Sequence, residues 1–292
     1  MPQERSDPDA PLSGARSTLL LGALVSVACQ GAGAFPRGDS GPSLPDAARN
    51  PLPLGVQDAS TKVDADSLSN DRGPRHTGPF EVPFGEGRTA FVLAPRSRTA
   101  PARLIAMMHG VCMTPGYTCG SWSETATSVG FLVCPTGNAT CDPGMGGGPT
   151  WEEPFADMDA DLERSISAAF EAFPGEFDRS GAILAGFSRG AYMAVVFAMR
   201  HPGRWPFLIL NEADVELTVP MMRYAGVRAV ALIAGEWGAQ IAGERKTFET
   251  MSRQGYPIRL WAMPKAGHFY STNIESIMRE AIDYVLAHEH DG

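Results

Sequence analysis

The stretch Gly186-Phe187-Ser188-Arg189-Gly190 constrains the fold more than any other part of this 292-residue chain. An apolar run over residues 180–185 precedes it, and a segment with helical spacing over residues 191–200 follows it. Gly-x-Ser-x-Gly between a strand and a helix is typical of a sharp turn that exposes a serine hydroxyl. The glycines permit the turn because they carry no Cβ that would clash. Ser188 is therefore a candidate nucleophile at the end of a strand.

Strand-like and helix-like segments alternate on both sides of this turn. Strands that alternate with helices of this length form a mostly parallel sheet with helices on both faces. We therefore predict a single α/β domain over residues 79–292. The apolar runs predict a hairpin of strands at 80–84 and 89–93, further strands at 103–108, 130–135, 180–185, 207–210, 227–234 and 258–263, and helices at 157–173, 191–200, 243–254 and 274–289.

Two segments precede this domain. Residues 17–29 form an apolar stretch about as long as the core of a signal peptide and too short to span a membrane. Small residues at 32–34 favour cleavage before Phe35, so we interpret residues 1–34 as a signal peptide of a secreted or periplasmic protein. A lipid anchor on Cys29, which would hold the protein at the cell envelope, is the alternative. Residues 35–78 are rich in Pro, Gly, Ser and Asp and are predicted to form a disordered tether.

The charge of the chain limits its partners. The formal net charge is -9, and no dense run of Lys or Arg appears. A protein that binds a phosphate backbone needs such a basic surface, so nucleic acid is not an expected partner.

The cysteines agree with export. After Cys29 the chain has four cysteines, an even number, which in an oxidising compartment predicts two disulfides. We expect Cys112 to pair with Cys119 and Cys134 with Cys141, since each bond would close a short loop; other pairings and four reduced thiols are the alternatives. No histidine accompanies them at zinc-site spacing, so neither a metal nor another cofactor is expected.

Two further segments supply what a serine nucleophile needs. His268 follows the last predicted strand, and its imidazole can take the proton of the Ser188 hydroxyl during attack and return it to the leaving group. His109-Gly110 follows the strand at 103–108. The backbone N–H groups of Val111 and Arg189 are therefore predicted to form an oxyanion hole.

These motifs together resemble the α/β-hydrolase superfamily over about residues 80–289. Within it, the chain looks most like exported carboxylesterases of the dienelactone-hydrolase-like, polyhydroxybutyrate-depolymerase-like and feruloyl-esterase-like group. The resemblance implies an α/β-hydrolase fold, a triad in the order serine, acid, histidine, and cleavage of a small-molecule or polymeric ester without a cofactor. It is carried by the serine turn, His109-Gly110, Pro135-Thr136-Gly137, Trp151 and Gly267-His268.

The chain departs from this family at the triad acid. Relatives usually read Gly-Glu-x-Asp after the strand that corresponds to 227–234, whereas this chain has Gly238 at the position of the aspartate. Asp214 and Glu212 follow the preceding strand, and Glu236 lies two residues before Gly238. We favour Asp214 as the acid, with Glu236 and Glu212 as alternatives.

Two functions follow from these observations. The first is a secreted serine carboxylesterase that forms an acyl-enzyme on Ser188, with His268 as general base. The second is a catalytically impaired α/β-hydrolase fold that serves as a binding module of the cell envelope, which Gly238 and the tether favour. A carboxylate in reach of His268 would discriminate between them.

Overall fold

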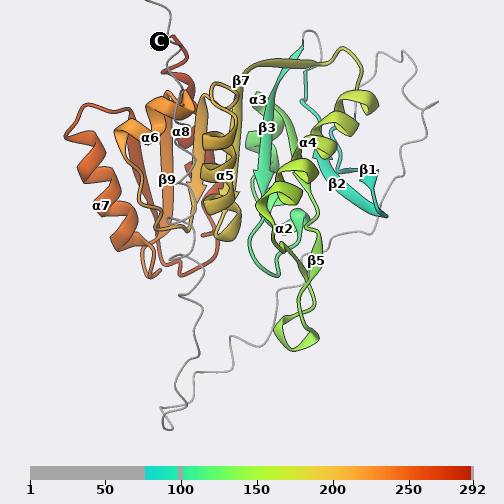
Figure 1. Cartoon of the computed structure of the whole chain (residues 1–292), viewed down its shortest axis with the longest axis horizontal. Coiled ribbons are helices and arrows are strands. Elements are labelled where there is room, and N and C mark those ends of the chain that lie inside the picture. The colour runs from blue at the N-terminus through green and yellow to red at the C-terminus, as the bar shows by residue number, and fades with distance from the viewer. Residues whose placement is uncertain (1–75, 98–100, 291–292) are drawn as a thin grey trace, which may run out of the picture. The chain divides into compact units, whose positions relative to one another are not determined.

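The computed structural model describes residues 76–97 and 101–290 (Figure 1). The predicted signal peptide, the alternative lipid anchor at Cys29 and the tether up to residue 75 lie outside the described residues. Within the described part, no helix combines the length and the apolar character that crossing a membrane requires.

An eight-stranded sheet forms the centre of the fold, with the strand order β1-β2-β4-β3-β7-β8-β9-β10. The first two strands form an antiparallel hairpin and β2 also pairs antiparallel with β4, whereas all pairs from β4 to β10 are parallel. The predicted hairpin and mostly parallel sheet are therefore confirmed. The strands are β1 (Phe80–Gly85), β2 (Arg88–Leu93), β3 (Ala102–Met108), β4 (Gly130–Pro135), β7 (Phe177–Phe187), β8 (Phe207–Asn211), β9 (Ala229–Gly235) and β10 (Ile258–Met263).

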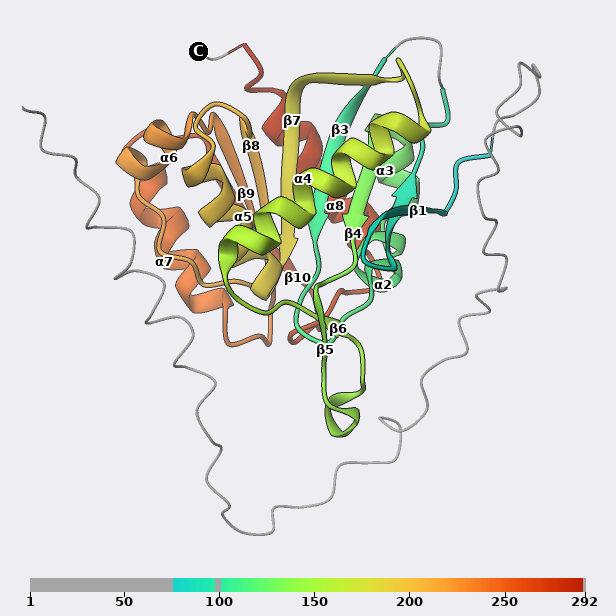
Figure 2. The ribbon, with the colours of Figure 1, turned by 45° about the vertical axis from the view of Figure 1, so that its right-hand side comes forward.

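Helices cover both faces of this sheet. Figure 2 shows α4 and α5 in front of the sheet and α3 and α8 behind it. Strand side chains alternate between the two apolar layers, because successive residues of a strand point to opposite faces. In β3, for example, Leu104 and Ala106 pack in the layer of α4 and α5, and Ile105 packs in the layer of α8. The helices are α2 (Pro115–Gly120), α3 (Ser123–Val129), α4 (Phe155–Ala172), α5 (Arg189–Arg200), α6 (Val219–Ala225), α7 (Ile241–Ser252) and α8 (Ile274–Leu286).

Several elements differ from the sequence-based boundaries. β7 runs from Phe177 to Phe187 and is longer than the apolar run at 180–185, because its first residues also pair with β3. The short helices α2, α3 and α6 were not predicted, nor was the small hairpin of β5 (Ala139–Thr140) and β6 (Pro149–Thr150). A 3-10 turn at Pro143–Met145 lies between these two strands.

The disulfide pairing predicted from the sequence is wrong. The structure joins Cys112 to Cys141 and Cys119 to Cys134. Residues 115–120 form α2, which turns Cys119 into the core against β4 and away from Cys112. Cys112 instead lies beside the β5–β6 hairpin, where a Cβ on Gly148 would come within 2.5 Å of its carbonyl oxygen.

The parallel strands bring distant segments together at one edge of the sheet. β3, β7, β8, β9 and β10 all end there, since parallel strands share their direction. The loops that follow these strands carry His109, Ser188, Glu212, Glu236 and His268. Ligands of open α/β sheets bind at this carboxyl edge, which makes it the place to look for a site.

Candidate active site

Ser188 occupies a strained turn between β7 and α5. Its φ is 52° and its ψ is -121°, a positive φ that residues with a side chain rarely adopt. Both glycines of the motif are required by space, because a Cβ on Gly186 would lie 2.3 Å from the Gly190 carbonyl oxygen and a Cβ on Gly190 would lie 2.0 Å from that of Met108. The turn therefore holds the serine at the carboxyl edge of the sheet, as the motif predicted.

His268 lies directly beside this serine. It comes from the loop after β10, and its Nε2 is 2.9 Å from Ser188 Oγ. The side chain is 41% exposed, so solvent reaches the ring from the surface. The ring also contacts that of Phe187, with 5.4 Å between ring centroids.

Glu212 approaches the other nitrogen of the histidine. Its Oε2 lies 3.2 Å from His268 Nδ1, and the side chain is fully buried. The other oxygen, Oε1, accepts the backbone N–H of Gly235 at the end of β9. Glu212 follows β8 directly and has a positive φ of 56°. The carboxylate is thus aimed at the imidazole from the loop after β8.

The structure does not bring Asp214, the acid favoured from the sequence, to His268. Asp214 accepts a hydrogen bond from the Tyr192 hydroxyl on α5, and its Cβ lies against Gly243. Glu236 is exposed and accepts the backbone N–H of Lys265 at 3.2 Å. Among these three carboxylates, the structure pairs Glu212 with His268.

Gly238 lies next to the Glu212 carboxylate. A Cβ built on Gly238 would be 3.1 Å from Glu212 Oε2. The loop after β9, where relatives keep an acid, and the loop after β8, which carries one here, therefore converge on the same space. The glycine leaves room for the longer side chain that arrives from the neighbouring strand.

The predicted oxyanion residues lie on either side of Ser188. A Cβ on Gly110 would be 3.2 Å from Ser188 Cβ, so the segment of Gly110 and Val111 passes close to the nucleophile. Arg189 follows Ser188 as the first residue of α5. The use of the Val111 and Arg189 N–H groups as an oxyanion hole stays a prediction.

His109 has a structural environment that the sequence did not reveal. Its ring is buried, its Nδ1 lies 2.7 Å from the Gly110 carbonyl oxygen, and its Nε2 accepts the Gly137 N–H at 2.9 Å. Trp151 stacks on the ring at 4.7 Å and donates its Nε1–H to the His109 carbonyl oxygen. Burial lowers the pKa of His109 to about 4, so the ring is neutral and donates through Nδ1. His109 thus fixes the backbone beside Ser188.

Large apolar side chains stand exposed on the loops that follow β3, β9 and β10. We call these three residues the apolar rim. Val111 follows Gly110, Phe269 follows His268, and the Trp237 N–H binds the Ala266 carbonyl oxygen in the histidine loop. The rim consists of Val111, Trp237 and Phe269.

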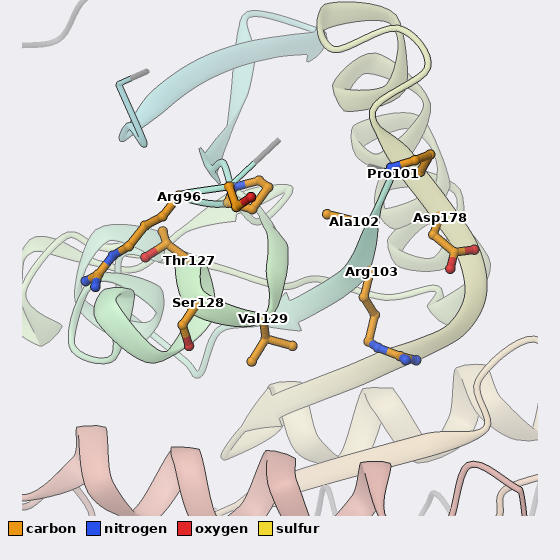
Figure 3. A pocket seen from close by; sticks show the side chains of 10 residues that line it. Arg96, Pro101, Ala102, Arg103, Thr127, Ser128, Val129 and Asp178 are labelled. Atoms are coloured by element: carbon orange, nitrogen blue, oxygen red, sulfur yellow. The ribbon is translucent and has the colours of Figure 1, made fainter. Parts of the chain in front are cut away.

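A cavity of about 570 Å³ lies at the opposite edge of the sheet. Figure 3 shows Ala102 and Arg103, at the start of β3, and Asp178, near the start of β7, among its lining residues. Since Ser188 follows the other end of β7, this cavity is separate from the candidate active site. In the part of the chain that the structure describes, no group of three or more His, Cys, Asp or Glu side chains is arranged to hold a metal ion.

The structure of this chain is similar to solved structures of other proteins. No family model and no curated protein matches the chain. An S-formylglutathione hydrolase from Agrobacterium tumefaciens matches with a TM-score of 0.52 at 15% identity, over 71% of this chain and 93% of that one. The Bacillus cereus carboxylesterase matches with a TM-score of 0.51 at 14% identity, over 69% and 96% of the two chains. A ferulic acid esterase matches with a TM-score of 0.51 at 14% identity, over 70% and 96%.

These matches show the fold of the protein. At such identities the likeness shows the fold, and the chain has the α/β-hydrolase fold. The resemblance stated from the sequence motifs is confirmed at this level.

Proposed function

We propose that this protein is a serine hydrolase that cleaves carboxylic esters through an acyl-enzyme on Ser188. The observation that carries the proposal is the continuous line of contacts from Ser188 Oγ to His268 Nε2 and from His268 Nδ1 to Glu212 Oε2. A nucleophile, a base and an acid that orients the base are the three parts of such a mechanism.

The geometry supports a definite role for each group. His268 Nε2 takes the hydroxyl proton as Ser188 Oγ attacks the ester carbonyl, and the negative charge that develops on the carbonyl oxygen is stabilised by the N–H groups of Val111 and Arg189. The protonated His268 then gives its proton to the departing alcohol. Water attacks the acyl-enzyme by the same steps and regenerates Ser188.

Glu212 supports the histidine in this scheme. Its carboxylate accepts the Nδ1–H of His268, which leaves Nε2 free to act as the base and stabilises the imidazolium that forms. The Gly235 N–H holds the other carboxylate oxygen, so the acid has a fixed orientation. This contact favours an enzyme over the alternative of an impaired binding module, because a carboxylate does reach the histidine.

The apolar rim supports an ester with an apolar acyl or alcohol part. Val111 and Phe269 are 43% and 49% exposed, and each follows a residue that lies beside Ser188. We propose an open site that accepts short or aromatic acyl groups, from a small molecule or a polymer. Faster hydrolysis of long-chain than of short-chain p-nitrophenyl esters would contradict this.

We also propose that the protein acts outside the cytoplasm, in the periplasm or after secretion. Two disulfides support this, because such bonds persist in oxidising compartments. Sequencing the N-terminus of protein from the native cell tests it: the proposal expects a start at Phe35, and an intact Met1 in a cytoplasmic fraction would contradict it.

Hydrolysis of p-nitrophenyl butyrate tests the activity. Ser188→Ala and His268→Ala are each expected to lower kcat/KM by about 10³-fold or more, because each removes a group that takes part in proton transfer or bond formation. Ser252→Ala and His290→Ala, which change the same residue types away from the site, should leave it unchanged. An inactive parent protein, or full activity in Ser188→Ala, would contradict the proposal.

A further inference from the structure

A second buried carboxyl group lies behind Glu212, and the proposed mechanism does not use it. Glu244 belongs to the first turn of α7 and is 1% exposed. Its Oε1 accepts the backbone N–H of Ala213 at 2.8 Å. Ala213 directly follows Glu212, so Glu244 holds the loop that carries the proposed triad acid.

The second oxygen of Glu244 indicates a proton on this group. In the described part of the chain, Glu244 Oε2 and Gln240 Oε1 are both buried without a hydrogen-bond partner. Gln240 precedes Glu244 by four residues at the start of α7, a spacing that places two side chains on one face of a helix. No donor in the described residues binds Glu244 Oε2, so an ionised Glu244 would bury a charged oxygen without a hydrogen bond, which is costly, whereas a proton on Oε2 makes the group neutral.

The groups around Glu244 also favour its neutral form. Burial raises the pKa of the Glu244 carboxyl well above its usual value, the Ala213 N–H opposes this, and the negative charges of Glu212 and Asp214 raise it further. Tyr192 on α5 also interacts with Glu244. These three facing groups are acidic or neutral, so none of them favours a carboxylate.

We propose that Glu244 is a positioning residue that works as a neutral carboxylic acid. It accepts the Ala213 N–H, fixes the turn at Glu212, and leaves Glu212 as the charged group that acts on His268. The effect on catalysis rests on the proposed function, whereas the effect on the histidine does not.

Glu244→Gln tests the protonation state. Glutamine has the shape of a neutral glutamic acid, and its amide oxygen can accept the Ala213 N–H. We expect kcat within about threefold of the parent and the acid limb of the kcat/KM profile at the same pH. If Glu244 is ionised in the working enzyme, Gln removes a negative charge near His268 and moves the acid limb to lower pH by about 0.5 unit or more, which would overturn the proposal.

Glu244→Ala and Glu244→Met test the positioning role. Neither side chain can accept the Ala213 N–H, so we expect kcat per active site to fall by about 10- to 100-fold with little change in KM. Titration of active sites with a fluorophosphonate measures the concentration of folded enzyme. Glu244→Met fills about the same volume as the native side chain and can be used if Glu244→Ala does not fold. Glu249→Ala, an exposed change on the same helix, is the control. Unchanged kcat in both Glu244 variants would overturn the proposal.

The ring resonances of His268 give a readout that needs no turnover. Assigned by their loss in His268→Ala, they should titrate at the same pH in the parent and in Glu244→Gln, and at a shifted pH in Glu244→Met. If the parent shows this pattern but does not hydrolyse esters, the proposed function is wrong and the role of Glu244 stands. If the parent hydrolyses esters but the titration is shifted in Glu244→Gln, the role of Glu244 is wrong and the proposed function stands.

Discussion

The two sides of the candidate site are held together by different means. On the acid side, the Glu212 carboxylate accepts the Gly235 N–H at the end of β9, and the Glu244 carboxyl group on α7 accepts the Ala213 N–H in the loop after β8. On the oxyanion side, a disulfide from Cys112, the buried ring of His109 and the stacked Trp151 hold the loop after β3.

The difference follows from what each side must present. The acid side has to bring one carboxylate oxygen to His268, and any neighbouring loop that reaches the space beside Gly238 can supply it. In the proposed mechanism the oxyanion side presents backbone N–H groups, whose position depends on the whole loop and not on one side chain. Covalent and aromatic contacts suit that task because they restrain the backbone.

The largest expected effect comes from the acid side. Glu212→Gln keeps the side-chain shape but removes the charge that stabilises the His268 imidazolium, so kcat/KM for p-nitrophenyl butyrate should fall by about 10³- to 10⁴-fold. Asp214→Asn and Glu236→Gln are the matched controls and should stay within about threefold of the parent. A large loss in either control, with an active Glu212→Gln, would reverse the assignment.

The triad carboxylate can be moved from the loop after β8 to the loop after β9. Because Gly238 adjoins the Glu212 carboxylate, Asp at 238 should place a carboxyl group near His268 once Glu212 is gone. We expect the double variant Glu212→Ala/Gly238→Asp to be at least about tenfold more active than Glu212→Ala. Gly238→Asp alone should lower activity, since two carboxyl groups then crowd one space. An inert double variant, folded by circular dichroism, would argue against interchangeable loops.

The two disulfides should separate stability from activity on the oxyanion side. The bonded cysteines are separated by 29 and 15 residues in the sequence. Removing either disulfide should therefore lower the free energy of unfolding, measured by urea denaturation, by about 3 to 4 kcal/mol. Only Cys112→Ser/Cys141→Ser should also lower kcat/KM, by about tenfold, because Cys112 follows Val111. Equal losses of activity in Cys119→Ser/Cys134→Ser would refute this distinction.

Low pH should lower the free energy of unfolding through His109, which holds the loop after β3. Its pKa is about 4 in the folded protein and about 6.5 in the unfolded chain, so the unfolded state binds the extra proton between these values. The stability that neutral His109 contributes is complete above pH 6.5 and falls by about 3 kcal/mol toward pH 4. In His109→Gln this part of the pH dependence should be absent. Urea unfolding of both proteins at several pH values measures it, and identical slopes would contradict it.

Much of the fold was accessible from sequence. Continuous apolar runs identified the buried strands, and the glycines around Ser188 identified the turn, because both depend on local constraints. The meeting of Ser188 with His268 was also predicted, since both follow parallel strands that end at one edge. Helix α2 was missed, and with it the disulfide pairing, because Cys119 is turned into the core by a short helix with little periodic signal.

The carboxylate that contacts His268 could not be predicted from the sequence pattern. Glu212 and Asp214 follow the same strand, and the choice between them depends on the positive φ at Glu212 and on the Tyr192 hydroxyl that engages Asp214. Neither is visible in a pattern of apolar residues. The structural role of His109 likewise depends on Gly137 and Trp151, which are distant in the chain.

The rate at which a fluorophosphonate labels Ser188 tests the proposed triad without knowledge of the natural ester. Intact mass spectrometry of the parent, Asp214→Asn and Glu212→Gln would give the three rates. We expect equal labelling of the first two and labelling of Glu212→Gln that is slower by about 100-fold or more. An unlabelled Ser188 in the parent, or equal rates in the parent and Glu212→Gln, would contradict the triad of Ser188, His268 and Glu212.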